Sequence, residues 1–456
     1  MTNALVPDRF ATPVVSAPNP IRLPAIERSV LPNGIRIWTL PHRALPVVSL
    51  SALIDVGTVD DPADLPGLVA IATDMLDEGA GGRDSIQLAE TLADLGSTLD
   101  LGAGPDATSA QLWTMRRHLD ASLRVLADVL TRPHFNDSDL TRVRELRLSR
   151  LQQLRRSAAS AADRTFAAAV FGQHGYGHPG LGTSASVGRV TMDDVRAHHA
   201  RHMAPSRVTI IAAGDVDHHE LVAMVSDIFG TWTATVPTAG TPEMAAPPAP
   251  GPRILFVARE GAPQSELRIG HLAVPRATPD YYALVLLNAG LGGSFSGRLN
   301  QRLRQQLGYT YGARSAFDMD RLAGSFACEA SVQGDKTADS VREMHALVAA
   351  VCADRPLDGE ELELARGSLT RGYARSFETP RQLSGALAQL AVYGLPDDTF
   401  DNFVPSMQAV TSADVAAAAQ ARLDPANLTT VVVGDPQWLD SLKALGAEVE
   451  VIEVEF

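Results

Sequence analysis

Two histidines in the first half of the chain have the spacing of a metal site. His198 and His202 stand four residues apart in a helical segment, so both imidazoles would lie on one helix face and could bind Zn²⁺. No acidic residue lies between them, and a similar segment 220 residues later has Ala418 and Arg422 at these places. We therefore interpret the pair as part of a solvated helix face.

Two other segments could also carry chemistry. His218 and His219 follow Asp217 at the expected start of a helix, where an N-cap accounts for them. The segment Gly292–Arg298 is rich in glycine, but Gly297 is followed by arginine and not by the Lys-Ser/Thr of a phosphate-binding loop. Nucleotide binding is not expected, and the segment is interpreted as a flexible loop between helices.

The charge of the chain limits its partners. Among 456 residues, 39 Lys and Arg stand against 53 Asp and Glu, which gives a net charge of −14 at pH 7. Such a surface repels a phosphate backbone, so nucleic-acid binding is not expected, whereas basic peptides would suit it. The two cysteines, Cys328 and Cys352, are too few for a disulfide scaffold and are expected to be free thiols.

No apolar run approaches the ~20 residues that a membrane span needs. The first nine residues also lack the basic segment and apolar segment of a secretory signal peptide. The sequence therefore predicts no membrane span and a cytoplasmic location, or a periplasmic one if the chain is a mature form.

An internal repeat organises the chain. Val190–Asp215 has the pattern of an N-capped helix, a proline-marked turn, a buried strand and a Gly-Asp end, and the pattern returns 220 residues later in Val410–Asp435. Thr191 and Thr411 are the expected N-caps. A period this long indicates a duplicated domain and not a solenoid.

A segment rich in proline separates the two copies. We expect an N-terminal extension over 1–28, a first domain over 29–235, a linker over 236–252 and a second domain over 253–456. Strands and helices follow one another without strict alternation, which favours two homologous α+β domains, each with a mixed or antiparallel sheet packed with helices. Predicted strands cover 34–40, 47–56, 111–115, 253–258, 267–274, 309–317 and 323–332, and predicted helices cover 67–76, 85–95, 119–130, 137–156, 279–291, 296–306, 336–353 and 359–376.

Six short motifs occur in order along the chain, namely Leu31–Gly34, Ile54–Thr58, Asp64–Leu68, Tyr176–Pro179, Gly261–Ser265 and Gly308–Gly312. Together they resemble the M16 (insulinase/pitrilysin-like) metallopeptidases over nearly the whole chain. The resemblance implies the M16/LuxS-like metallohydrolase fold. For a chain of this length it also implies the short, two-domain branch, whose members work as dimers that enclose a peptide chamber.

The resemblance also shows which catalytic residues are missing. Active members carry His-x-x-Glu-His on the helix after a Gly-Leu pair, where the histidines bind Zn²⁺ and the glutamate acts as general base. Here the matching positions hold Ala70, Thr73 and Asp74. Alanine has no lone pair for a metal, and threonine is no base at neutral pH. Glu145, further on, could add one carboxylate, which cannot rebuild a site, so no metal or other cofactor is expected in this chain.

Active M16 enzymes use an arginine and a tyrosine seven residues later, from the domain opposite the zinc, and Arg304 and Tyr311 match that spacing. The arginine is expected at a helix end and the tyrosine at a strand start, so both could point into one cavity. There they could stabilise the charge that develops on an attacked peptide carbonyl. Arg302 and Tyr309 have the same spacing, so the register could be off by two.

In one mitochondrial relative, a glycine-rich loop at the place of Gly292 and Gly293 contacts substrate. The resemblance therefore implies that these two glycines, together with Tyr309, contact peptide in this chain.

The sequence thus predicts the zinc-less subunit of a heterodimeric M16 peptidase. A homologous, zinc-bearing sister subunit would cleave the peptide substrate, and this chain would be inactive alone, with a weaker homodimer possible in isolation. Two alternatives stay open: a structural scaffold protein of the same fold, and a peptide-binding, chaperone-like module without peptidase activity.

Overall fold

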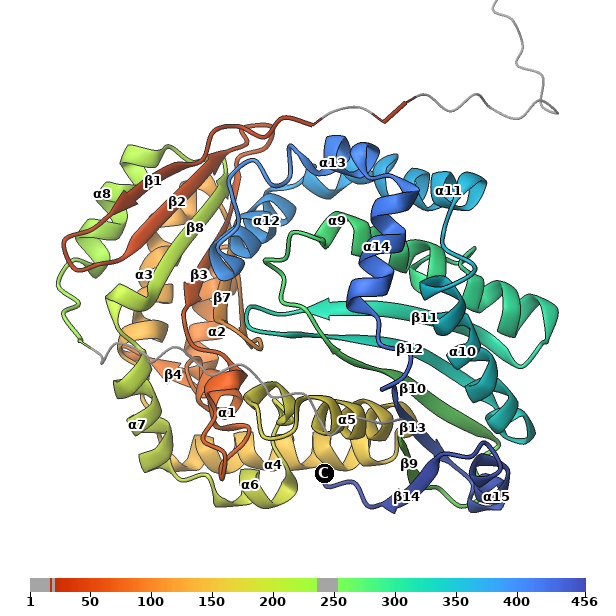
Figure 1. Ribbon diagram of the computed structural model, residues 1–456. Coiled ribbons are helices and arrows are strands. Elements are labelled where there is room, and N and C mark those ends of the chain that lie inside the picture. The colour runs from red at the N-terminus through yellow and green to blue at the C-terminus, as the bar shows by residue number, and fades with distance from the viewer. Residues whose placement is uncertain (1–16, 19–20, 236–252) are drawn as a thin grey trace, which may run out of the picture.

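The computed structural model describes residues 17–18, 21–235 and 253–456 (Figure 1). The linker predicted over 236–252 lies outside the described residues, as do 1–16 and 19–20 of the predicted extension. The first half contains strands β1 (Glu27–Val30), β2 (Arg36–Pro41), β3 (Val47–Ile54), β4 (Gly79–Ala80), β5 (Arg83–Asp84), β6 (Thr98–Ala103), β7 (Thr108–Met115) and β8 (Val208–Gly214). Its helices are α1 (Leu68–Asp74), α2 (Ser85–Asp94), α3 (Leu119–Thr131), α4 (Asp137–Arg155), α5 (Ala158–Phe171), α6 (Ser184–Arg189), α7 (Met192–His202) and α8 (His218–Phe229).

The second half contains strands β9 (Arg253–Ala258), β10 (Gln264–Ala273), β11 (Thr310–Met319), β12 (Gly324–Gln333), β13 (Thr429–Gly434) and β14 (Glu448–Ile452). Its helices are α9 (Tyr281–Asn288), α10 (Thr337–Cys352), α11 (Gly359–Thr370), α12 (Pro380–Tyr393), α13 (Phe403–Ala409), α14 (Ser412–Arg422) and α15 (Leu439–Lys443). Two π-helical segments, Ala289–Gly293 and Asn300–Gln306, replace parts of the helices predicted over 279–291 and 296–306.

The two halves form sheets of the same design. The first has the order β1-β2-β8-β3-β7-β6, and the second has the order β14-β9-β13-β10-β12-β11. In both, the strand of the repeated motif (β8 or β13) pairs in parallel with one neighbour and antiparallel with the other. The predicted α+β class and the duplication are confirmed, while the predicted domain limits stay a prediction.

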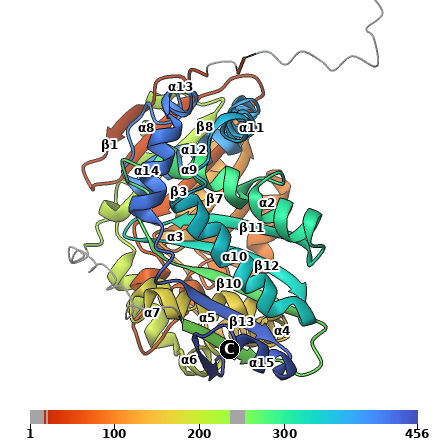
Figure 2. The same ribbon diagram turned by 45° about the vertical axis from the view of Figure 1, so that its right-hand side comes forward.

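Each sheet is covered on its inner face by a helix from the other half (Figures 1 and 2). Helix α5 packs its small and aromatic residues, including Ala162 and Phe166, against Val431 of the second sheet. Helix α12 packs Leu383 and Leu387 on the first sheet in the same way. Because each half completes the core of the other, the halves are expected to unfold together.

The local predictions at helix starts are also confirmed. Thr191 and Thr411 each accept a backbone N–H three residues further on at 3.2 Å, and Asp217 does so at 3.1 Å.

Cys328 and Cys352 are free thiols. Within the described residues, no helix combines the length and the apolar character that crossing a membrane requires. The cytoplasmic location stays a prediction.

The turn between β11 and β12 fastens the second half to the first. Its Arg321 bonds to Asp55 (Nη1 to Oδ1, 2.6 Å), and the Arg321 backbone N–H donates to Asp106 (2.8 Å). Asp106 is 3% exposed and also accepts the hydroxyl of Tyr176, which in turn accepts the N–H of Leu322 at 3.2 Å. We call Asp55, Asp106, Tyr176 and Arg321 the interdomain clasp.

A further carboxyl beside the clasp is sensitive to pH. Burial raises the pKa of Asp320 to about 7, and the nearby carboxylates of Asp106 and Asp318 add to the rise. A carboxyl whose pKa is raised in the folded protein favours folding most at low pH. Its contribution is lost between its ordinary value near 4 and the folded value near 7.

We therefore predict that Asp320→Asn makes folding stability less dependent on pH. In urea unfolding from pH 4 to pH 8.5, the variant should gain stability over the wild type as pH rises to about 7, after which the difference should stay constant. Parallel stability curves for the two proteins would show that Asp320 ionises normally.

Candidate functional site

Helix α1, which the resemblance matches to the zinc helix of active M16 enzymes, begins at a turn that requires glycine. Gly67 has φ +93°, and a Cβ there would lie 2.7 Å from the backbone of Gly182. Asp61 caps this start by accepting the N–H groups of Gly67 (2.7 Å) and Val69 (2.8 Å). Burial raises the pKa of Asp61 to about 6 despite these hydrogen bonds. Residues 68–73 of the helix are buried.

The three residues at the zinc-motif positions lie together on α1 but offer no metal site. Ala70 has no donor atom, and the buried hydroxyl of Thr73 donates to the backbone carbonyl one turn earlier at 2.8 Å. Asp74 is ion-paired with Arg147 of α4, whose side chain is 7% exposed. A zinc ion needs several protein donors and would be repelled by the guanidinium, so these residues do not fit zinc.

Other parts of the fold do not supply the missing ligands. Glu145 lies on the exposed side of α4, while Arg147 turns inward, so the carboxylate considered from the sequence does not join the site. In the ranges 17–18, 21–235 and 253–456, no cluster of three or more His, Cys, Asp or Glu side chains could hold a metal ion.

A cavity of about 420 Å³ adjoins Asp74 and Arg147. We call it the degenerate-site pocket. Its lining includes Ala70, Asp74, Ala103, Arg147, Tyr176, His178 and Asp320. The Nη1 atom of Arg147 and the Nδ1 atom of His178 are buried without a hydrogen-bond partner among the described residues. Burial lowers the pKa of His178, as does the neighbouring His174, so this imidazole is uncharged at neutral pH.

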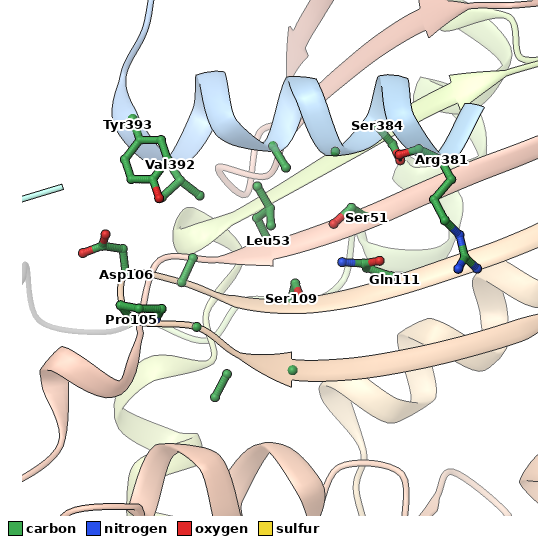
Figure 3. Close-up of a pocket in the computed structure, with 16 residues that line it drawn as sticks. Ser51, Leu53, Pro105, Asp106, Ser109, Gln111, Arg381, Ser384, Val392 and Tyr393 are labelled. Atoms are coloured by element: carbon green, nitrogen blue, oxygen red, sulfur yellow. The ribbon is translucent and has the colours of Figure 1, made fainter. Parts of the chain in front are cut away.

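A second cavity, of about 370 Å³, lies between α12 and the strands β3, β6 and β7. Ala103 and Pro105 line both cavities. Figure 3 shows Arg381 and Gln111 at one end of the second cavity, with Asp106 at the other. We call the two cavities together the β6 groove, because β6 is the edge strand of its sheet and its last residue lines both.

Arg304 and Tyr311 lie outside the β6 groove. Arg304 belongs to the second π-helical segment, and its guanidinium lies 4.4 Å from the ring centroid of Phe295. Tyr311, at the start of β11, is 90% exposed, and Phe295 is 66% exposed. The predicted pair is therefore presented on an open surface of this chain and not in a cavity of its own.

Comparison with known proteins settles the family. Residues 40–184 match the family described as Insulinase (Peptidase family M16), and residues 189–369 match the Peptidase M16 inactive domain. The chain belongs to the M16 peptidase family. The inactive-domain match does not include α1, so the loss of the zinc ligands rests on Ala70, Thr73 and Asp74 themselves.

Individual M16 relatives agree with this assignment. The chain is 27% identical over 368 residues to an uncharacterized zinc protease of Mycobacterium tuberculosis, covering 80% of this chain and 83% of the relative. It is 26% identical over 351 residues to an uncharacterized zinc protease of Mycobacterium leprae, covering 77% and 79%. The crystal structure of a peptidase M16 inactive domain from Pseudomonas fluorescens has the same fold, with a TM-score of 0.84, 24% identity and coverage of 90% and 98%.

The glycine-rich segment of this M16 chain is ordered by packing. Gly292 lies so close to β11 that a Cβ would come within 2.6 Å of the Ser315 backbone. Gly293 lines a separate cavity of about 360 Å³. Arg298, the last residue of the segment, bonds to both carboxylate oxygens of Glu361 at 2.7 Å. A short loop over 294–297 does lie between two helical segments, as expected, while Gly292 and Gly293 belong to the first π-helical segment; the flexibility of the loop stays a prediction.

The histidines considered above as possible functional residues pack against other residues of this chain. His198 and His202 stack with their ring centroids 4.7 Å apart, and burial lowers their pKa values to about 3 and about 4. The solvated helix face expected for this pair is only partly present, because both side chains are half-buried. His218 is buried between Ser29 and Thr39, each 2.8 Å from one of its ring nitrogens.

The sequence interpretation missed Arg147, although the sequence does contain a signal for it. Helix α4 turns Leu140, Val143 and Leu151 into the core, and Arg147 occupies the inward position between them. An arginine in an otherwise apolar helix stripe predicts a carboxylate partner. The identity of that partner, Asp74, required the structure.

We predict that Arg147 excludes zinc even when the zinc motif is restored. The purified wild type should carry no stoichiometric zinc. The triple variant Ala70→His, Thr73→Glu, Asp74→His should bind zinc at least about tenfold more weakly than the same variant with Arg147→Gln, which removes the guanidinium that repels the ion and adds no carboxylate ligand. Titration against a chromophoric chelator measures both affinities. Equal affinities, or one tightly held zinc per wild-type chain, would contradict this role of Arg147.

Proposed function

We propose that this chain is the zinc-less subunit of a heterodimeric M16 peptidase and supplies Arg304 and Tyr311 to the zinc site of a homologous sister subunit. The observation that carries the proposal is that Tyr311 lies far from the zinc-motif position of the same chain. The zinc-motif position is taken by the Asp74–Arg147 ion pair, while Tyr311 is 90% exposed on a distant surface.

The length of β11 gives the size of that separation. Tyr311 stands at the start of this strand, and Asp320, just past its end, lines the degenerate-site pocket. Nine residues of extended chain span roughly 25–30 Å. This separation of Tyr311 from the pocket beside Asp74 supports a role for the tyrosine at a site on another chain.

Two residue pairs have the required spacing, and their contacts favour Arg304 and Tyr311 over Arg302 and Tyr309. Arg302 is held by both carboxylate oxygens of Glu343, at 2.7 and 2.9 Å. Tyr309 is half-buried against the second core. The guanidinium of Arg304 lies over the ring of Phe295. Because this contact uses the face of the guanidinium, its N–H groups stay available for a peptide carbonyl.

The proposed chemistry follows from these donors. A sister subunit would supply the metal, the attacking water and the general base. This chain would donate hydrogen bonds from the Arg304 guanidinium and the Tyr311 hydroxyl to the scissile carbonyl, where negative charge develops. Gly293 and Tyr309 would contact the peptide next to these two donors. Gly292 would contribute by packing closely against β11, the strand that carries Tyr311. Alone, the chain would not cleave peptides.

A scaffold protein of the same fold is the second candidate. A scaffold has no requirement for an exposed tyrosine at this position, so the exposure of Tyr311 favours the subunit function. Assays of variants in the assembled complex distinguish the two.

We predict that Arg304→Ala or Tyr311→Phe lowers kcat/KM at least tenfold in the heterodimer formed with the zinc-bearing chain that co-purifies from the native host. Loss of one donor to a developing oxyanion typically costs ~10²–10³ in rate. Assembly and bound zinc should not change, and part of the loss should appear in KM, because contacts to bound peptide are also lost.

Arg302→Ala and Tyr309→Phe serve as register controls, and both should retain most of the activity. Full activity in all four variants would exclude the assisting role and leave the scaffold function.

A further inference from the structure

The separate cavity beside Gly293, of about 360 Å³, is lined by residues of α9, β11, α11 and α12. We call it the α9 pocket, because α9 and its neighbouring residues contribute Arg276, Tyr281, Val285 and Asn288 to it. Arg276 is a charged residue of this lining, and no acidic side chain lines the pocket in the part of the chain that the structure describes. In a chain with a net charge of −14, a pocket with such a lining favours an anionic ligand.

The guanidinium of Arg276 is held in place and keeps its hydrogen-bond donors. The backbone N–H of Arg276 donates to the carbonyl of Asp320 at 2.9 Å, and its guanidinium carbon lies 3.5 Å from the ring centroid of Tyr281. Asp280, the acid nearest to it in the sequence, is instead bonded to Arg422 at 2.6 Å. Within the described residues the Arg276 guanidinium has no hydrogen-bond or ion-pair partner. Because stacking uses the face of the guanidinium, its N–H groups can meet a ligand.

Two other polar groups of the α9 pocket also donate hydrogen bonds. The side-chain oxygen of Asn288 accepts the hydroxyl of Ser315 at 2.7 Å, which leaves the Asn288 NH₂ group for a ligand. Burial raises the pKa of Tyr281, and Tyr282 adds to the rise while Arg276 opposes it, so the Tyr281 hydroxyl keeps its proton at neutral pH. A carboxylate only accepts hydrogen bonds, and it therefore suits a pocket whose polar groups donate.

The rest of the lining indicates the body of the ligand. Val285, Phe317, Met319 and Leu369 present apolar side chains to the same cavity. Ligand sites in proteins have volumes of roughly 300–1,000 Å³, so the α9 pocket is at the small end of that range. Among the described lining residues, Arg276 is the one cation, which matches a ligand with a single negative charge.

We propose that the α9 pocket binds a small organic acid that has one carboxylate and an apolar body, with the carboxylate bonded to the Arg276 guanidinium. The C-terminal carboxylate of a peptide that ends in an apolar residue presents the same chemistry. This site goes beyond the proposed function, because it depends on neither Arg304, Tyr311 nor a partner chain.

The test uses the purified full-length chain alone and isothermal titration calorimetry with phenylacetate. A ligand of this size in a matching pocket should bind with a Kd of about 1 mM or tighter. The uncharged analogue phenylacetamide should bind at least about tenfold more weakly, because a hydrogen bond between two charged groups is stronger than one to a neutral acceptor.

Two variants test the residues of the pocket, and circular dichroism checks that each is folded. Arg276→Gln removes the cation and should weaken phenylacetate binding at least about tenfold. Asn288→Asp places a negative charge in the pocket, while its side-chain oxygen can still accept from Ser315, and should cause a similar loss. Arg371→Gln is the matched control, since Arg371 is exposed at the end of α11 and does not line the pocket. It should leave the Kd unchanged.

A short acetylated peptide, Ala-Ala-Phe with a free C-terminus, distinguishes the two sources of the carboxylate. Tighter binding than that of phenylacetate would support a site for peptide C-termini, and weaker binding would support a site for free small acids. Three results would overturn the inference: no measurable binding of either acid, an amide that binds as tightly as its acid, or a Kd that neither Arg276→Gln nor Asn288→Asp changes. None of them bears on the role of Arg304 and Tyr311, which is measured in the heterodimer.

Discussion

Arg147 carries a positive charge into a nearly dry part of the molecule, where a charge without a partner is strongly destabilising. Asp74 is the partner that this fold provides, and the two side chains join α1 to α4. The resemblance matches this part of α1 to the zinc helix of active M16 enzymes, and in this chain it forms an ion pair within the protein. On that match, a zinc site here would require replacement of the guanidinium as well as the zinc motif on α1.

The duplicated architecture holds the fold together without any contribution from residues 70–74 as metal ligands. The two sheets have the same order, and each is completed by a helix of the other half, α5 or α12. None of these contacts depends on a metal ligand. The hairpin of β11 and β12 spans the molecule, with the interdomain clasp at its turn and Tyr311 near its far end. One rigid element therefore places the exposed tyrosine relative to the first domain.

The sequence was sufficient for features that depend on local patterns. The repeat around Thr191 and Thr411, its N-caps, the buried strands and the degenerate helix after Gly67 all follow from short-range spacing. Features that depend on distant contacts could not be predicted. The sequence does not show that α5 and α12 cross between the halves, nor that α7 packs against the rest of the domain and desolvates His198 and His202. The exposure of Tyr311 is likewise set by packing between elements.

Native mass spectrometry of the heterodimer tests the central claim most directly, because it counts the metal ions and assigns them to a chain. The account predicts a 1:1 complex with one zinc ion, and gentle dissociation should release this chain without metal and its sister with zinc. A zinc ion that stays with this chain, or a complex with one zinc in each subunit, would contradict it.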